Sequence, residues 1–225
     1  KEALQLTKNT QPAILIVSHS IFRFLKDEYG FDLSSFKFFA GHSLGEYSAL
    51  VCSNSLNYED AIYLLHERGK AMQEAVPVGS GSMMAVLGIK IDDITQLLKT
   101  KKDKGICEVA NDNANGQVIV SGDKEGIESF QILLKEKKIK TIPLKVSAPF
   151  HCSLMKPAAN AMEEKINNTQ FRDPSLKIIS NVTASPVSNS EDIKRLLIEQ
   201  IFSTVKWRES IIKMQKEGVK TFIEI

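Results

Sequence analysis

Residues 41–45, Gly41-His42-Ser43-Leu44-Gly45, decide the fold of this 225-residue chain. They have the G-x-S-x-G pattern of a nucleophile elbow, in which two glycines allow a sharp turn from a strand into a helix. The short apolar run 36–40 precedes the pattern, and the Ala-rich, helix-compatible stretch 46–52 follows it. The order strand, tight turn, helix therefore predicts that Ser43 is a nucleophile. The alternative is a glycine-flanked turn without chemistry.

A serine nucleophile needs a base, and the chain has four histidines: His19, His42, His66 and His151. The first and third fall in predicted helices, and His42 adjoins the serine but precedes the turn. His151 lies in the apolar, non-helical segment 147–152, where the chain returns to its main body. Such crossings border clefts, so we predict that His151 is the base. A buried structural histidine is the equally weighted alternative.

A charged residue interrupts the apolar face of the helix predicted over 58–75. Arg68 falls at helical spacing among three apolar residues, Ala61, Leu65 and Met72. A buried guanidinium requires an anion, and arginine matches a carboxylate with two parallel hydrogen bonds. We therefore expect Arg68 to bind a carboxylate of the substrate. The alternatives are an internal partner such as Glu46, or a side chain that reaches solvent.

The middle of the chain differs from its two ends. Short apolar runs alternate with amphipathic helices there, with strands predicted at 83–89, 106–110, 118–121 and 141–146 and helices at 92–101 and 124–138. The order β-α-β-β-α-β is that of a ferredoxin-like unit. We therefore predict an α/β fold in which residues 1–78 and 149–225 form an α/β-hydrolase-like core with a parallel sheet, and residues 79–148 form an inserted ferredoxin-like subdomain.

The remaining elements complete this core. Near-continuous apolar character over 11–26, at Ile14, Val17, Ile21, Phe24 and Leu25, predicts a mostly buried helix. Further helices are predicted at 155–167, 191–201 and 208–217, and strands at 177–181 and 219–225. The chain opens with Lys1 in helical spacing, and the last apolar run has no turn or cap. We expect it to be an internal segment of a longer protein, truncated at both ends of the core.

Composition excludes several classes of protein. The 29 basic and 27 acidic residues are interleaved and give a net charge of +2, which argues against nucleic-acid binding. The apolar runs are too short to span a membrane. The three cysteines lack C-x-x-C spacing, which argues against disulfides and against a metal site. We expect a cytoplasmic protein without a metal, and a monomer by default.

Four segments in order resemble the malonyl-CoA:acyl carrier protein transacylase family, whose domain relatives load polyketide synthases. GHSLGEYSAL at 41–50 is similar to the family's nucleophile segment, and ERGKAMQ at 67–73 to its arginine helix. NANGQV at 113–118 resembles a loop of its small subdomain, and PFHCSLM at 149–155 its histidine segment. The resemblance spans nearly the whole chain.

The resemblance implies a ping-pong acyl transfer through a malonyl-serine intermediate. Ser43 is then the nucleophile, His151 the base and Arg68 the ligand of the malonyl carboxylate, while the Leu44 amide stabilises the oxyanion. Met72 and Asn113 are further substrate-binding residues. A backbone carbonyl in the segment 204–207 orients the histidine, without an acidic residue, and a second oxyanion donor, a glutamine near the family's N-terminus, is absent from this chain.

The implied substrates are malonyl-CoA and an acyl carrier protein with its phosphopantetheine thiol, with no resident cofactor. A serine esterase or thioesterase shares the elbow, and an acyltransferase domain of a polyketide synthase shares every motif. A module that binds a carrier protein without turnover is a third alternative. Acidic carrier proteins favour a basic surface, for which candidates are Lys156, Lys206, Arg208 and Lys213. Methylmalonyl selectivity depends on the volume near Phe150, and we expect this segment alone to be weakly active or inactive.

Overall fold

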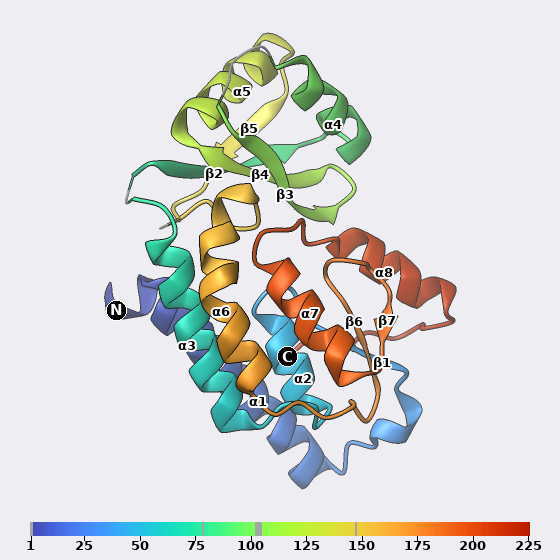
Figure 1. Ribbon diagram of the computed structural model, residues 1–225. Helices are drawn as coiled ribbons and strands as arrows, with labels where there is room; N and C mark the ends of the chain where they lie inside the picture. Colours follow the sequence, from blue (N-terminus) through green and yellow to red (C-terminus); the bar gives the residue numbers. More distant parts are fainter. Residues whose placement is uncertain (1, 78, 102–104, 147) are drawn as a thin grey trace.

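The computed structural model describes residues 2–77, 79–101, 105–146 and 148–225. Its elements form a mixed α/β arrangement around two separate sheets. Figure 1 shows the four-stranded sheet with α4 and α5 at one end of the molecule and the helices of the main body at the other. In the described part of the chain, no helix has the length and apolar character needed to cross a bilayer.

The sheet of the main body is small and mixed. Strand β1 (Phe38–Ala40) pairs in parallel with β6 (Lys177–Ile179), and β6 pairs antiparallel with β7 (Pro186–Val187). The predicted parallel sheet is therefore limited to β1 and β6 among the described strands. Strand β7 was not predicted, since two residues are too few for an alternating pattern. Strands β6 and β7 are antiparallel because only a short turn joins them.

Helices surround this sheet and supply most of the core. They are α1 (Thr7–Tyr29), α2 (Gly45–Cys52), α3 (Tyr58–Glu74), α6 (Lys156–Asn168), α7 (Ser190–Gln200) and α8 (Trp207–Lys216), with the short 3-10 helices η1 (Glu2–Gln5), η2 (Leu33–Ser35) and η3 (Ser153–Met155). The largest apolar cluster joins α1, α2, α3, α6 and α7 and includes Leu15, Tyr47, Leu65, Met162 and Leu197. Each of these α-helices begins and ends within a few residues of its predicted position.

The prediction that the first helix is mostly buried is wrong. Within α1, the described buried side chains are Gln11, Leu15 and Phe22, whereas Val17 is 59% and Phe24 is 55% exposed. Among the described elements the helix packs mainly against α3 and α2, and these two helices leave much of its surface uncovered. A near-continuous apolar run does not indicate which face is covered, so the pattern overestimated the burial.

The predicted last strand, 219–225, is also absent from the structure. These residues form no ladder with any described strand, and Phe222 and Ile223 are 44% and 48% exposed. An alternating apolar sequence becomes a strand only where a neighbouring strand accepts its hydrogen bonds. The run therefore has strand propensity but no strand beside it here.

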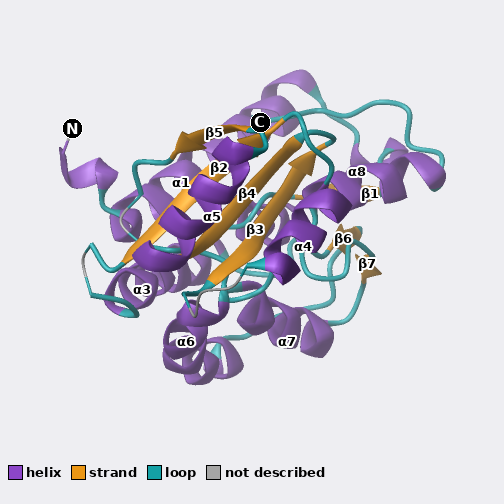
Figure 2. Ribbon diagram, turned by 90° about the horizontal axis from the view of Figure 1, so that it is seen from above, coloured by secondary structure: helices purple, strands orange, loops and turns teal. Residues whose placement is uncertain are grey.

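The small sheet has the chain order predicted from the sequence. Strands β2 (Gly81–Leu87), β3 (Cys107–Ala114), β4 (Gln117–Asp123) and β5 (Lys140–Pro143) lie in the order β3-β4-β2-β5, and all neighbours are antiparallel. Helices α4 (Ile91–Thr100) and α5 (Lys124–Glu136) cover one face of it (Figure 2). A separate apolar core lies between, with Met84, Val86, Val118, Val120 and Phe130 at its centre.

Strand β3 joins the small sheet to the main body. The Asp112 amide donates to the Val205 carbonyl at 3.0 Å, and the Val205 amide donates to the Ala110 carbonyl at 2.9 Å. The Arg208 guanidinium also pairs with the Asp112 carboxylate at 2.8 Å. These contacts hold β3 beside α8, so the turn after β3 has a fixed position relative to the main body.

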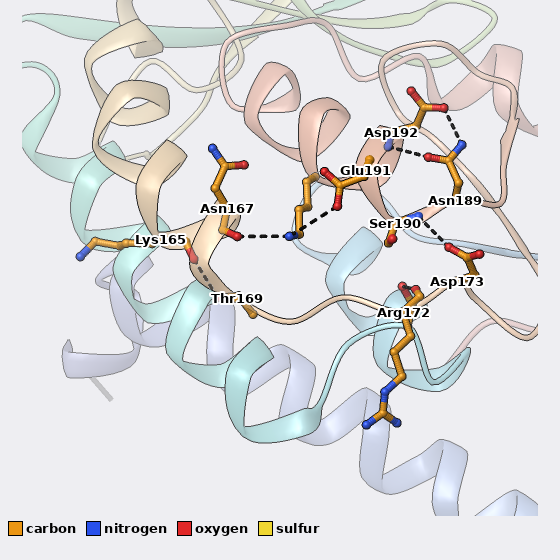
Figure 3. Close-up of polar contacts among 11 residues, drawn as sticks. Lys165, Asn167, Thr169, Arg172, Asp173, Asn189, Ser190, Glu191 and Asp192 are labelled. Carbon is orange, nitrogen blue, oxygen red and sulfur yellow. Dashed lines mark hydrogen bonds and ion pairs between the residues drawn. The ribbon is translucent and has the colours of Figure 1, made fainter.

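Helix α7 is anchored at its first turn, far from its functional end. The Asn189 side chain caps the helix by accepting from the Asp192 amide at 2.8 Å, and the Ser190 amide donates to the Asp173 carboxylate at 2.9 Å (Figure 3). A capping residue of this kind contributes about 1 kcal/mol to helix stability. The anchor fixes the helix whose last residue, Gln200, enters the site described next.

Candidate active site

Ser43 lies at the top of a sharp turn between β1 and α2. Its backbone is left-handed, with φ of 53°. A Cβ on Gly41 would come within 1.9 Å of the Gly45 carbonyl oxygen, so only glycine fits where the strand meets the helix. A left-handed non-glycine residue costs on the order of 1–3 kcal/mol and persists only where its surroundings hold it. The predicted elbow is thus present as a strained turn.

His151 contacts Ser43 although the two residues are 108 positions apart in the sequence. Its Nε2 lies 2.8 Å from the Ser43 Oγ, and its Nδ1 lies 2.9 Å from the backbone oxygen of Gln200. Because a carbonyl oxygen can only accept, Nδ1 carries the proton and Nε2 is free to accept from the serine hydroxyl. Burial, and next the charge of Arg68, lower the pKa of His151 to about 3. The imidazole is therefore a neutral hydrogen-bond acceptor at neutral pH.

The carbonyl that orients His151 is not where the sequence placed it. We expected it within 204–207, but it belongs to Gln200, the last residue of α7. The final carbonyls of a helix have no partner within the helix and are free to accept from outside. Val205 instead exchanges backbone hydrogen bonds with β3. Among the described residues, no carboxylate contacts the His151 ring.

Arg68 is buried beside the same serine. Its side chain is 1% exposed, its Nη1 donates to Gln11 Oε1 at 2.6 Å, and its Nη2 donates to Gln200 Oε1 at 2.9 Å and to Ser43 Oγ at 3.1 Å. The Nε atom is buried and has no partner among the described residues. No ion pair involving Arg68 is found among the described residues, so Glu46, the alternative partner within the chain, is not in direct contact with it. The guanidinium thus keeps its charge without a bound anion.

Gln200 connects these groups and is not among the site residues predicted from the sequence. Its Nε2 donates to Glu46 Oε2 at 2.6 Å and to the Ser43 carbonyl at 3.1 Å, while its Oε1 accepts from Arg68. The side chain is fully buried. Gln11, 4% exposed on α1, was missed in the same way. Polar residues on otherwise apolar helix faces were the available signal, the one that singled out Arg68.

Asn181, just after β6, is a second residue that sequence reasoning missed. Its Oδ1 accepts from the Ser43 amide at 2.7 Å, and its Nδ2 donates to the Gly41 carbonyl at 2.8 Å. One fully buried amide thus binds the backbone on both sides of the turn. It holds the strained conformation of Ser43 from a neighbouring strand.

We expect Asn181→Ala to lower the free energy of unfolding by about 2–4 kcal/mol, because it leaves two buried backbone groups without partners. Urea denaturation measures this loss. Asn160→Ala on α6 is the control, since Asn160 is exposed and alanine is favoured in helices. Equal stability of the two variants would mean that Asn181 does not hold the turn.

Comparisons with known proteins identify the family of this chain. Residues 1–225 match the model of the acyl transferase domain family. The chain is 44% identical over 226 residues to malonyl CoA-acyl carrier protein transacylase of Bacillus subtilis, a match that covers 100% of this chain and 70% of that protein. This chain belongs to the malonyl CoA-acyl carrier protein transacylase family.

Solved structures of the transacylase family share the fold. The transacylase from Coxiella burnetii superposes with a TM-score of 0.95 at 35% identity, covering 100% of this chain and 70% of that one. A malonyl-transacylase in complex with a type II PKS acyl-carrier protein gives a TM-score of 0.92 at 37% identity, covering 97% and 70%. Membership of the transacylase family thus rests on sequence and on fold.

The structure also describes the three other predicted site residues, Leu44, Asn113 and Met72. Leu44 precedes the first turn of α2, and its amide has no hydrogen bond to any described group. Asn113 Oδ1 lies 2.9 Å from His42 Nε2. Met72 is 1% exposed, and its sulfur lies 3.8 Å from Gln11 Nε2. Met72 thus supports a partner of Arg68, and its direct contact with substrate stays a prediction.

A cavity of about 520 Å³ lies beside Asn113, between the turn after β3 and α8. It is lined by Lys90, Asn113, Ala114, Asn115, Arg208, Ile211 and Ile212.

Two of the four basic residues proposed to meet a carrier protein are engaged within the chain, since Arg208 pairs with Asp112 and Lys213 with Glu217. No group of three or more metal-ligating side chains occurs among the described residues.

Proposed function

We propose that this protein transfers the malonyl group from malonyl-CoA to the phosphopantetheine thiol of an acyl carrier protein, through a malonyl-serine intermediate, for fatty acid synthesis. One observation carries the proposal. The Ser43 Oγ is within 2.8 Å of a neutral imidazole nitrogen and 3.1 Å of a guanidinium nitrogen. A nucleophile, its base and a cation for an acyl carboxylate therefore converge on one atom.

In the first half-reaction, Ser43 Oγ attacks the thioester carbonyl carbon while His151 Nε2 takes the hydroxyl proton. The carbonyl oxygen becomes an oxyanion, for which the unpartnered Leu44 amide at the start of α2 is the available donor. Collapse breaks the carbon–sulfur bond and leaves malonyl on the serine. The departing thiolate of coenzyme A receives the proton from His151.

The second half-reaction runs the same steps in reverse with a new thiol. His151 takes the proton of the phosphopantetheine thiol, and the sulfur attacks the malonyl-serine carbonyl. The bond to Ser43 Oγ then breaks, and the serine regains its proton from His151. One base thus serves both half-reactions, because it returns to its neutral state after each transfer.

Arg68 supports a carboxylated acyl group over a neutral one. No carboxylate of the described chain contacts its buried charge directly, since the Gln200 amide lies between Arg68 and Glu46, and its Nε–H is not engaged. A malonyl carboxylate supplies both the counter-charge and the acceptor, in a charge-assisted hydrogen bond. An acetyl group supplies neither, so the site favours the donor with the free carboxylate.

Replacing Arg68 with leucine should lower kcat/KM for malonyl-CoA by roughly 10²–10⁴-fold, because removal of one partner of a buried ion pair costs about 3–5 kcal/mol. The rate with acetyl-CoA should change far less, since acetyl has no carboxylate. Steady-state transfer assays with both donors measure this ratio. Arg23→Leu on the exposed face of α1 is the control. Equal losses for both donors would contradict the assignment.

Two alternative functions would use most of the same site residues. A thioesterase would use the same serine and base but would pass the acyl group to water, and a polyketide synthase domain would pass it to a synthase carrier. Incubation with malonyl-CoA, with and without a carrier protein bearing phosphopantetheine, separates the first alternative. We expect malonyl-carrier protein as the main product and a stable malonyl-enzyme without the carrier. Rapid formation of free malonate would favour the thioesterase.

We also infer that residues 1–78 and 149–225 form an α/β-hydrolase-like core and that residues 79–148 form a ferredoxin-like insertion. The strand–elbow–helix order around Ser43 supports the first assignment. The β-α-β-β-α-β order and the separate apolar core of the small sheet support the second. The monomeric state and the cytoplasmic location stay predictions from the sequence.

A further inference from the structure

One buried carboxylate in the site has no part in the proposed chemistry. Glu46, in the first turn of α2, is 4% exposed. Its Oε2 accepts from Gln200 Nε2 at 2.6 Å and from the Asn181 amide at 3.2 Å. Both donors are neutral, and no ion pair of Glu46 is found among the described residues. An ionised carboxylate in such a place requires a positive charge nearby.

The positive charge that faces Glu46 is Arg68, on the opposite side of one amide group. Gln200 donates to Glu46 through Nε2 and accepts from Arg68 through Oε1. The two charges therefore fix the orientation of the Gln200 amide, since a flipped amide would present a donor to a cation and an acceptor to an anion. The other titratable groups near the pair are Tyr47 and His151, both uncharged at neutral pH.

The negative charge of Glu46 balances the positive charge of Arg68 only while no acyl carboxylate is bound. Burial raises the pKa of Glu46 to about 7, while the hydrogen bonds from Gln200 and Asn181, and then the charge of Arg68, oppose the rise. When an acyl carboxylate pairs with Arg68, the site gains a negative charge and Glu46 loses the benefit of its counter-charge. The pKa of Glu46 must then rise further, so the carboxyl group binds a proton more tightly.

We propose that Glu46 is a positioning residue that balances the charge of Arg68 through Gln200 in the free enzyme and takes up a proton when a carboxylated acyl donor binds. The inference rests on the proposed function, because it requires that Arg68 receive an acyl carboxylate. It adds that selection of the malonyl donor is linked to the protonation of a residue that never touches the substrate.

Calorimetric titration of the Ser43→Ala variant tests the proposal, because this variant binds the donor without reacting. Binding of malonyl-CoA is measured near pH 7.5 in buffers of different ionisation enthalpy, which gives the number of protons taken up. We expect net uptake of a fraction of a proton, at most one, relative to acetyl-CoA, whose coenzyme A moiety is identical. Adding Glu46→Gln should remove this difference while malonyl-CoA still binds.

The outcomes separate this inference from the proposed function. Failure of Ser43→Ala to bind malonyl-CoA would count against the proposed function itself. Tight binding without extra proton uptake, or uptake that persists in the Glu46→Gln double variant, would overturn the role of Glu46.

If Glu46→Gln does not fold, the pH dependence of Ser43→Ala alone decides. The Kd for malonyl-CoA should then increase between pH 7 and 8.5 relative to the Kd for acetyl-CoA, because proton uptake is harder at higher pH. Parallel curves for the two donors would overturn the proposal.

Discussion

Ser43→Ala abolishes formation of the malonyl-enzyme and lowers the rate of malonyl transfer by roughly 10⁴–10⁶-fold, the range expected when the nucleophile of a serine–histidine pair is removed. Alanine keeps the left-handed turn but removes the oxygen atom that His151 and Arg68 both contact. The measurement is the intact mass of the protein after brief exposure to malonyl-CoA, with transfer to a carrier protein followed in parallel.

Ser48→Ala provides the matched control for this experiment. Ser48 lies on α2, five residues after the half-buried nucleophile, and is buried, with a hydroxyl that has no partner among the described residues. The control variant should acquire the malonyl group as the wild type does. An adduct that persists on Ser43→Ala would place the acyl group on another residue and overturn the proposed intermediate.

The elbow could be predicted from the sequence because its cause is local. Gly41 is required because a Cβ there would meet the Gly45 backbone oxygen four residues later, and the strand and helix on either side follow from the neighbouring apolar pattern. Arg68 was found because one helix carries both the charge and the apolar stripe that buries it. The order of elements in the small sheet was predictable for the same reason, since each pattern lies within one short segment.

The features that sequence reasoning missed depend on contacts between distant segments. Gln200 approaches the elbow across 157 positions and Asn181 across 138. Gln200 continues the buried stripe of α7, but its amide carries no charge that demands a partner, and Asn181 lies outside every described helix and strand. The exposure of α1 and the unpaired segment 219–225 were misjudged likewise, because burial and pairing depend on which neighbour is present.

The site therefore separates into chemical groups that a motif reveals and supporting groups that only the fold reveals. Ser43, Arg68 and His151 come from three separate segments, and Gln200 contacts all three, through its side chain or its backbone oxygen. Because the Asn189 side chain caps the first turn of α7, the helix holds its last residue, Gln200, in a fixed position relative to Ser43, Arg68 and His151. The relative positions of the three reacting side chains thus depend on Gln200, which takes no part in a chemical step.

His151→Ala should lower the rate of acylation by about 10²–10⁴-fold, the contribution of a general base, while Ser43 stays in place. Single-turnover formation of the acyl-enzyme measures this loss, and added imidazole should restore part of it by occupying the vacated space. His66→Ala on α3 is the control, because the His66 ring contacts the Lys8 carbonyl and takes no part in the site. Equal rates for the His151 variant and the wild type would exclude His151 as the base.

The pH profile of the wild type gives an independent test of the same assignment. A pKa lowered to about 3 means that His151 is neutral, and able to accept a proton, at every pH well above 3. The acylation rate with acetyl-CoA, which has no carboxylate to engage Arg68, should therefore show no inflection from His151 as the pH falls from 8 to 5. Any change near pH 7 that comes from Glu46 should disappear in Glu46→Gln. An unperturbed histidine would instead lose activity around pH 6.5, as its base form disappears. A midpoint near 6.5 that persists in Glu46→Gln would mean that His151 is solvated during catalysis, in conflict with its burial between the elbow and α7.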